Sequence, residues 1–296
     1  MASTVEGYLA ELRQALAGQD PALVHDALYD AEDFLRSAVA EKGDTPESVA
    51  AAIDAYGSPE EIAAAYREAE ASAAIVLRPP KRPAAATWYG RFFGVVGDSS
   101  AWGALFYMLL ALATGTVYFS VVVAGLSTVL GTMVLIVGIP LALLFIAAVR
   151  AISLAEGRLV EGLLGVRMPR RPRSVGQTGT IWERVKGWFT DYRTWTTMLY
   201  MVLQLVLGIG YFTIVVTGLA LTVTLFAAPI VQVLSDTTII RSAEYGYYIY
   251  PWAMPLVMFA GVLALFATLW VAKGIGYLHG QYAKAMLIGT FERSAS

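Results

Sequence analysis

The sequence predicts an all-α protein, in which a small soluble helical bundle precedes a polytopic membrane domain of four transmembrane helices. Three observations predict this class. Of the 296 residues, 57% are hydrophobic and only 15% are charged, which is too apolar for an ordinary soluble protein. Residues 102–149 and 194–235 contain no charged side chain. Each stretch can hold a helical hairpin, because one span needs about 20 apolar residues. The third observation is an internal repeat.

Residues 88–125 align without a gap with residues 181–218, at a constant offset of 93 positions. Fourteen of the 38 aligned positions are identical, including several that apolar segments do not share by chance: Asp98/Asp191, Trp102/Trp195, Tyr107/Tyr200 and Tyr118/Tyr211. The segments 154–165 and 278–289 also align, at an offset of 124, so the second repeat carries a 31-residue insertion within 220–253. The pattern indicates a duplicated membrane module.

We expect three parts along the chain: an acidic helical bundle (1–77), a Pro-rich basic linker (78–87) and the membrane domain (88–293). The two repeats of the membrane domain cover 88–165 and 181–289. Residues 1–77 carry a net charge of −11 and the rest of the chain +9. Asp20-Pro21, Thr45-Pro46 and Ser58-Pro59 predict helix starts, because a capping side chain followed by proline favours the first turn.

Within the membrane domain we expect interfacial helices at 88–99 and 181–192, spans near 103–124, 129–149, 196–219 and 254–273, and exit helices beyond them. Asp98 and Asp191 are expected to cap spans, and Gly138-Ile139-Pro140 to kink one. No Asp, Glu, Arg or His lies in these spans, and Lys273 stands at the end of the last one. Gln204 is interpreted as an inter-helix hydrogen-bonding residue, and His279 as an interfacial residue just past the last span.

The lysines and arginines predict the orientation. The segments 78–91, 150–193 and 273–293 carry 16 of them, whereas the turn near 126 and the 220–253 segment carry only Arg241. The positive-inside rule then places both termini and the 150–193 loop in the cytoplasm. Two spans per repeat predict a two-fold axis along the membrane normal.

Two stretches carry resemblances. YLAELRQAL (8–16), LYDAEDFL (28–35) and AIDAYGSPEEIAAAY (52–66) resemble the HAAS family of bacterial helical signalling domains, which occur beside PadR-type transcription regulators. DYRTWTTMLYMVLQLVLGIGYF, LLGVRMPRRPR and GYLHGQYAKAMLIG resemble a bacterial four-helix membrane sensor domain that is often fused to histidine kinases. No kinase follows here, so the resemblance implies that output passes through residues 1–77 or the cytoplasmic loops.

Candidate site residues fall into two groups, each with an alternative. Asp26, Asp30 and Asp33 repeat at helical spacing, as either a solvated face or a docking face for a basic partner or the protein's own basic rim. The second group is a ligand lid, or alternatively an aromatic belt at the outer leaflet. Its members lie in the outer segment: Asp236, Arg241, Glu244, Tyr245, Tyr247, Tyr248, Tyr250 and Trp252.

The residues favour a non-enzymatic membrane sensor that relays a membrane or envelope signal through its N-terminal domain. Catalytic motifs are missing, and with no Cys and only two His we expect no cofactor, no metal and no catalytic residue. The expected partners are membrane lipids and a cytoplasmic signalling protein, which the resemblance implies to be a PadR-type regulator. A second copy of the chain, forming a homodimer, is a further alternative. The acidic charge argues against direct nucleic-acid binding. The alternative is an accessory or scaffolding subunit of a transporter or envelope complex; a lipid-handling enzyme fits the residues less well.

Overall fold

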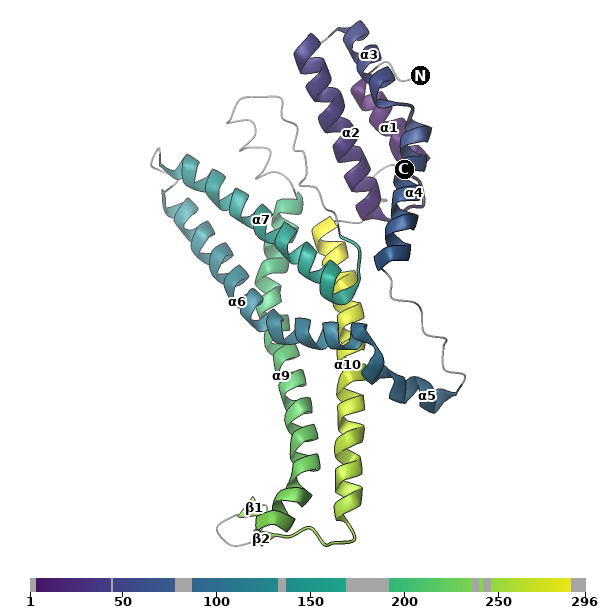
Figure 1. Cartoon of the computed structure of the whole chain (residues 1–296). Helices are drawn as coiled ribbons and strands as arrows, with labels where there is room; N and C mark the ends of the chain where they lie inside the picture. Colours follow the sequence, from purple (N-terminus) through teal and green to yellow (C-terminus); the bar gives the residue numbers. More distant parts are fainter. Residues whose placement is uncertain are drawn as a thin grey trace.

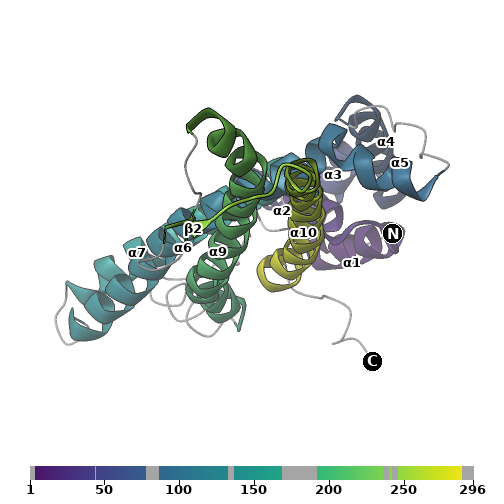
Figure 2. The same cartoon turned by 90° about the horizontal axis from the view of Figure 1, so that it is seen from below.

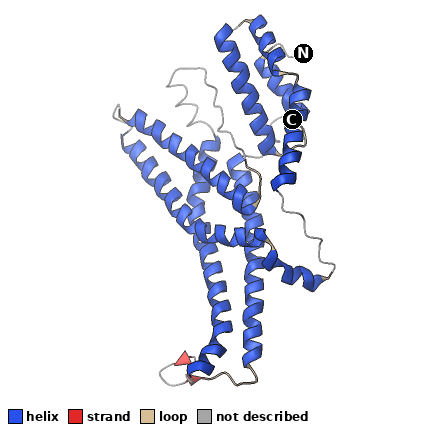
Figure 3. Ribbon diagram, in the orientation of Figure 1, coloured by secondary structure: helices blue, strands red, loops and turns tan. Residues whose placement is uncertain are grey.

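The computed structural model describes residues 4–43, 45–77, 87–132, 137–168, 192–235, 240–241 and 246–288. Nearly all of this part is helical, and the short strands lie at one end of the molecule (Figure 3). Four helices are long and apolar enough to cross a membrane, which agrees with the predicted fold class: Ser99–Thr132, Gly138–Leu164, Thr194–Leu234 and Met254–Leu287.

The N-terminal bundle consists of α1 (Val5–Ala15), α2 (Pro21–Lys42), α3 (Pro46–Tyr56) and α4 (Pro59–Leu77). The predicted caps are present: Asp20 accepts a hydrogen bond from the N–H of Ala22, and Thr45 one from that of Ser48. Leu12, Leu23 and Leu35 are among the fully buried side chains of its core. Local capping chemistry therefore sets where these helices begin.

The α3–α4 corner joins three parts of the bundle. Gly57 has a φ of +110°, which glycine adopts without strain, and lets the chain turn. Ser58 and Glu61 form a reciprocal capping box at the start of α4. The buried hydroxyl of Tyr8 donates to the carbonyl of Gly57 at 2.9 Å, which ties α1 to this corner.

The entry to the first repeat follows the prediction. The helix α5 (Trp88–Phe93) gives way at its glycines to a 3-10 turn, η1 (Gly94–Gly97). Asp98 then caps α6 (Ser99–Thr132), accepting from the N–H of Ser100 at 3.0 Å. It also receives a hydrogen bond from Lys273 at 2.6 Å. The corresponding segment 181–191, with Asp191, lies outside the described residues.

The remaining helices are longer than the expected spans. They are α7 (Gly138–Leu164), α9 (Tyr192–Ser235) and α10 (Met254–Ile288). The turn expected near 126 is wrong, because 126 lies within α6 and α7 begins at Gly138. The expectation of a kink at Pro140 is wrong, because Pro140 lies in the first turn of α7, where a missing N–H costs no helical hydrogen bond. The expected exit segments are not separate, since 154–164 continues α7 and 278–288 continues α10.

Paired glycines bring α6 against α9 at close range. A Cβ on Gly115 would lie 2.7 Å from the carbonyl oxygen of Gln204, and one on Gly208 would overlap the carbonyl of Ala111. Gly115 and Gly208 are equivalent in the two repeats, as are Ala111 and Gln204. The contact is therefore made by the same positions from both sides, as an internal two-fold requires.

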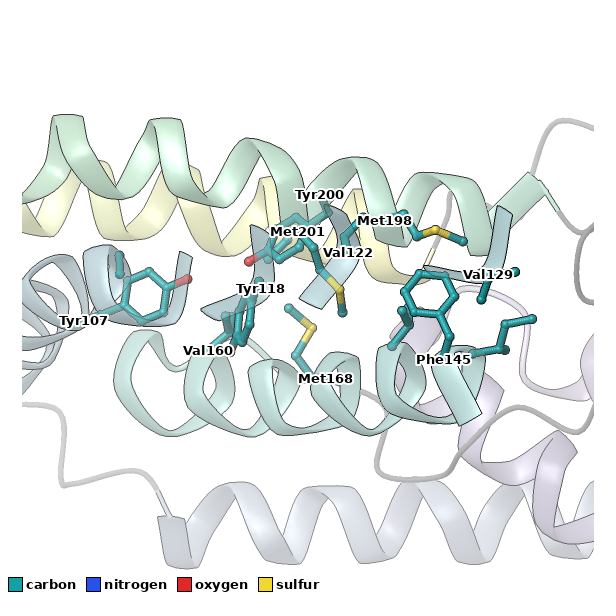
Figure 4. Close-up of a cluster of buried hydrophobic side chains, with 14 of the residues drawn as sticks. Tyr107, Tyr118, Val122, Val129, Phe145, Val160, Met168, Met198, Tyr200 and Met201 are labelled. Carbon is teal, nitrogen blue, oxygen red and sulfur yellow. The ribbon is translucent and has the colours of Figure 1, made fainter. Parts of the chain in front are cut away.

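The direction of the two helices differs from the sequence-based expectation. Gly115 meets Gln204 while Ala111, earlier in α6, meets Gly208, later in α9, so α6 and α9 run in opposite senses at their contact (Figure 4). An axis along both helices would make them parallel. The two-fold runs across the helices instead, because the glycines that allow close approach occupy symmetric positions on both.

The two hairpins consequently leave this contact in opposite directions. The ends of α6 and α7 that face each other, Thr132 and Gly138, lie toward the end of the molecule that carries the bundle, whereas β1 (Ile240–Arg241) and β2 (Gly246–Tyr247) lie at the other end (Figure 1). Seen from below, α6 and α7 project to one side of the α9–α10 pair, and the bundle lies on the other (Figure 2).

Much of the predicted outer loop is helix. Residues 220–235 continue α9, with Pro229 inside it. The first part of the segment that holds the insertion therefore lengthens this helix. The segment that follows is held by Gln232. Its amide donates to the carbonyl of Ile249 and accepts from the N–H of Ile249, both at 2.8 Å. Gln232 is buried and thereby fixes the chain between β2 and α10.

Candidate functional site

A buried polar network occupies the contact between the two repeats. Glu156 of α7 and His279 of α10 are each only 1% exposed. Around them lie a glutamine and five tyrosines from α6, α9 and α10: Gln204, Tyr107, Tyr118, Tyr200, Tyr211 and Tyr282. Figure 4 shows the hydroxyl ends of Tyr107, Tyr118 and Tyr200 converging from α6 and α9.

Glu156 accepts three hydroxyl hydrogen bonds. Tyr107 and Tyr200 donate to its Oε1 atom at 2.6 and 2.8 Å, and Tyr118 donates to its Oε2 atom at 2.8 Å. A carboxylate has enough lone pairs to accept all three. Hydrogen bonds to a charged acceptor are stronger than neutral ones, so the cluster stabilises a negative charge that burial alone would penalise.

His279 lies beside the same hydroxyls. Its Nε2 atom is 2.6 Å from the Tyr107 oxygen and 3.1 Å from the Tyr200 oxygen. Its Nδ1 atom is 3.1 Å from the Tyr211 oxygen. The Gln204 amide donates to Tyr107 at 2.9 Å, which makes the inter-helix hydrogen bond expected for Gln204. The acid and the base are thus linked through shared hydroxyls rather than by direct contact.

The tyrosines of the network are two equivalent pairs. Tyr107 and Tyr200 correspond in the repeat alignment, and so do Tyr118 and Tyr211. In each helix the pair is 11 residues apart, three turns, so both side chains face the same way. Tyr118 meets Glu156 where Tyr211 meets His279. The hydroxyl frame is therefore two-fold symmetric, and the acid and base are what differ.

Sequence reasoning missed Glu156 and misplaced His279. Both were assigned to exit helices beyond the spans, whereas the helices continue and bury them. The signal was present, because the exit alignment places the two within one position of each other. Repeated tyrosines in charge-free helices also needed buried partners, since a buried hydroxyl is normally hydrogen-bonded.

The acidic face of α2 reaches the membrane domain in part. Asp26 is buried and its carboxylate is 3.6 Å from the guanidinium of Arg167, which also pairs with Glu70 of α4. Asp20 pairs with Lys284 of α10 at 2.6 Å. Asp30 instead accepts from Tyr66 inside the bundle, and Asp33 is exposed.

The aromatic outer segment does not form a compact group in the described part. Tyr248, Tyr250 and Trp252 are 52%, 65% and 72% exposed. Arg241 lies in β1 and Tyr247 in β2, but the structure does not describe their side chains. Asp236, Glu244 and Tyr245 lie outside the described residues. The ligand lid and the aromatic belt both stay predictions.

The comparisons with known proteins give two family matches. The HAAS family matches residues 7–65. The Sensor family, described as "Putative sensor", matches residues 107–287, more than half of the chain. The chain belongs to the Sensor family. All eight network residues lie within this match. No curated protein and no solved structure matches.

The order of the two matches agrees with the resemblances in the sequence. Both are signalling families rather than catalytic ones. With four helices that can span a bilayer, the protein is a membrane signalling protein that carries a HAAS domain. Among the residues that the structure describes, no group of three metal-ligating side chains comes together.

Proposed function

We propose that this protein relays the state of the buried network to its N-terminal bundle, and through the bundle to a protein partner. The observation that carries the proposal is a shared use of two helices. Helix α10 holds His279 in the network and, five residues on, Lys284 on Asp20 of the bundle. Helix α7 holds Glu156, and Arg167, three residues past its end, pairs with Asp26 and Glu70.

The geometry supports mechanical coupling. A helix moves largely as a rigid element, so a shift of α7 or α10 at the network also displaces the cation at its end. The ion pairs at the bundle are partly buried, with side chains of Arg167 and Lys284 that are 18% and 20% exposed. Such pairs depend on geometry more than exposed ones do. A small shift is therefore enough to weaken the bundle contact.

The partner is proposed to bind the bundle. HAAS domains are associated with PadR-like regulators, which favours a protein of that kind. The −11 charge of residues 1–77 favours a protein with a basic surface and disfavours DNA. We place the protein in the inner membrane with both termini in the cytoplasm. The lysines and arginines of 150–193 and 273–293 support this, as does the pairing of Asp20 near one terminus with Lys284 near the other.

A charge swap tests the bundle contact. Asp20→Lys and Lys284→Glu each place like charges together, so we expect faster amide hydrogen exchange in the last turns of α10. The first turn of α2 is left out of the readout, because Asp20→Lys also removes the cap of that helix. The double variant restores an ion pair of opposite polarity and should restore slow exchange in α10. Asp33→Lys, on an exposed site of α2, is the matched control and should leave α10 unchanged.

Two results would contradict the proposal. One is exchange in the last turns of α10 that is unaffected by the single reversals, since the pair would then not hold the bundle. The other is failure of the swap to recover what the singles lose. The accessory-subunit alternative predicts the same contact, but a bundle whose position does not depend on the network. The distance between the bundle and the membrane domain in a Tyr107→Phe variant distinguishes the two.

A further inference from the structure

The protons of the network can be assigned from its contacts. Tyr107 and Tyr200 each have one hydroxyl hydrogen, and both donate it to Oε1 of Glu156. They can therefore only accept from Nε2 of His279, so this nitrogen carries a hydrogen. The amide of Gln204 donates to Tyr107 and is consistent with this assignment.

The other nitrogen of His279 is left with two possibilities. Nδ1 lies 3.1 Å from the hydroxyl oxygen of Tyr211, which can donate or accept. If Tyr211 donates, the imidazole is neutral; if Nδ1 donates, it is an imidazolium. The same heavy-atom geometry thus holds the histidine with or without one extra proton.

That extra proton decides the charge of the site. With it, a carboxylate and an imidazolium sum to zero; without it, one negative charge remains buried. In the described part of the chain no lysine or arginine forms an ion pair with Glu156. Lys284 and Lys273, the nearest cations along α10, are paired with Asp20 and Asp98. An uncompensated charge among apolar helices is strongly unfavourable.

We propose that Glu156 and His279 form a binding site for a single proton, held between them through the hydroxyl of Tyr107. The proton can rest on either side. The Nε2–H bond of His279 breaks as an O–H bond forms on Tyr107, while the hydroxyl hydrogen of Tyr107 passes to Glu156. This leaves a neutral acid and a neutral imidazole. Both arrangements are neutral overall, so the pair holds one proton in either form.

All four long helices, α6, α7, α9 and α10, contribute to this site. Glu156 comes from α7 and His279 from α10, and the remaining polar groups that face them come from three helices: Tyr107 and Tyr118 of α6, Tyr200, Gln204 and Tyr211 of α9, and Tyr282 of α10. Loss of the proton leaves three hydroxyls around an uncompensated carboxylate. The site then has to admit water, which separates α7 from α10.

Two buried atoms mark where water or a polar group can enter. Oε1 of Gln204 and the hydroxyl of Tyr282 have no hydrogen-bond partner among the described residues. Gln204 is fully buried, so its carbonyl oxygen is a costly orphan when the site is dry. Hydration on loss of the proton would satisfy both atoms. Loss of this proton would regulate the proposed relay. Only its effect on the bundle rests on that proposed function.

The test reads the site itself in the full-length chain, reconstituted in lipid nanodiscs. The chain has two histidines, so ¹⁵N-histidine labelling gives two sets of signals, and His25→Gln identifies those of His279. Titration from about pH 5 to about pH 9 covers the range in which histidine pairs respond. We expect one step in the His279 signals, with amide protection in 154–164 and 278–288, corrected for the intrinsic pH dependence of exchange, falling on the same step as pH rises.

Two variants give the controls. Glu156→Gln keeps the size of the side chain but removes its charge, so the site is neutral with a neutral imidazole. We expect no exchange step in 154–164 over the titration. Tyr118→Phe keeps both titratable groups and removes one hydroxyl donor to the carboxylate, so the step should persist at a shifted pH. It also covers the case in which Glu156→Gln does not fold.

The proposal is overturned if neither the His279 signals nor the exchange in 154–164 shows a step across the titration, or if Glu156→Gln retains the wild-type exchange step. A Tyr118→Phe step at unchanged pH would also count against it, since the hydroxyl would then not contact the ionised group. The His279 signals and the exchange in 154–164 do not involve the bundle. A failed relay therefore leaves them intact, and a failed proton site leaves the charge-swap result at Asp20 and Lys284 intact.

Discussion

At the scale of single residues, the notable feature is a buried carboxylate that pairs with no lysine or arginine in the part of the chain that the structure describes. Glu156 is held by three phenolic hydroxyls, which are neutral donors that an apolar helix tolerates more easily than a lysine or arginine. Each tyrosine buries a ring and presents one hydroxyl at its end. The repeats supply these tyrosines twice, so duplication explains how a symmetric hydroxyl frame formed around an asymmetric acid and base.

Asp98 shows how a boundary residue combines two roles. It caps α6 and pairs with Lys273 of α10. Partial burial opposes ionisation of this carboxyl, but the hydrogen bonds from Lys273 and Ser100 outweigh it and lower its pKa. Because the folded pKa lies below the unfolded one, Asp98 stabilises the fold above the unfolded value, about 3.9, and this contribution is lost as pH falls through the folded value.

We therefore expect Asp98→Asn, which can still cap, to lower the free energy of unfolding at neutral pH by less than ~1 kcal/mol, since the pair is partly solvated. The difference from the wild type should shrink as the pH drops below about 4. Thermal unfolding in detergent across pH measures it. A deficit that persists unchanged at acid pH would show that the ion pair is not its cause.

At the scale of elements, the sequence predicted the parts that depend on local chemistry. The bundle helices begin at Asp20, Thr45 and Ser58 as expected, because a cap is a property of a few neighbouring residues. The four long apolar helices were also predictable, since hydropathy is a property of a window. The break of α5 into η1 followed from its glycines.

What the sequence could not predict depends on contacts between distant elements. Hydropathy ends a span at its first polar residues, so Glu156 and His279 were placed outside, although their helices continue. The direction of α6 against α9 is set by where Gly115 and Gly208 meet the facing backbone. The number and position of charged residues in the sequence do not determine this direction. The ion pairs that Asp26 and Asp20 make with Arg167 and Lys284 join residues far apart in the chain.

The glycine contact makes a prediction for the α6–α9 pair. Gly208→Ala places a methyl group against the carbonyl of Ala111, so the helices must separate. We expect a loss of about 1–3 kcal/mol, typical of overpacking, measured as a lower unfolding temperature in detergent. Gly210→Ala, two residues on with open space, should be neutral or slightly stabilising, because alanine favours helix. Equal effects of the two variants would exclude a packing cause.

The clamp at Gln232 makes a second prediction at this scale. Its amide holds both backbone groups of Ile249, so Gln232→Ala leaves them without that partner. We expect faster amide exchange and earlier protease cleavage in 246–253, with α6 and α7 unaffected. Thr222→Ala, also on α9 and bonded only within its own helix, is the control. Unchanged protection of 246–253 would show that Gln232 does not fix this segment.

At the scale of the whole molecule, α7 and α10 connect the centre of the membrane domain to the bundle at one end. Helices α7 and α10 carry network residues in their length and bundle-binding cations at or beyond their ends. Ala22 of α2 is buried in the same apolar cluster as Met168 and Ala283, so the ion pairs surround a packed contact. The bundle is therefore attached to the two helices that the network holds together.

The most direct measurement of this connection is the distance between the bundle and the membrane domain by pulsed electron paramagnetic resonance. The chain has no cysteine, so Asp33→Cys on α2 and Leu144→Cys on α7, both exposed, give a clean labelled pair. The distance is compared in nanodiscs for this background and for three further changes. Lys284→Gln breaks the bundle contact, Tyr107→Phe breaks the network centre, and Gly210→Ala is the control.

We expect Lys284→Gln and Tyr107→Phe to broaden the distance distribution toward longer values, and Gly210→Ala to leave it unchanged. Tyr107 does not touch the bundle, so its effect can only reach the labels through the helices. A distribution that responds to Lys284→Gln but not to Tyr107→Phe would contradict the relay and show that the bundle is a fixed tether.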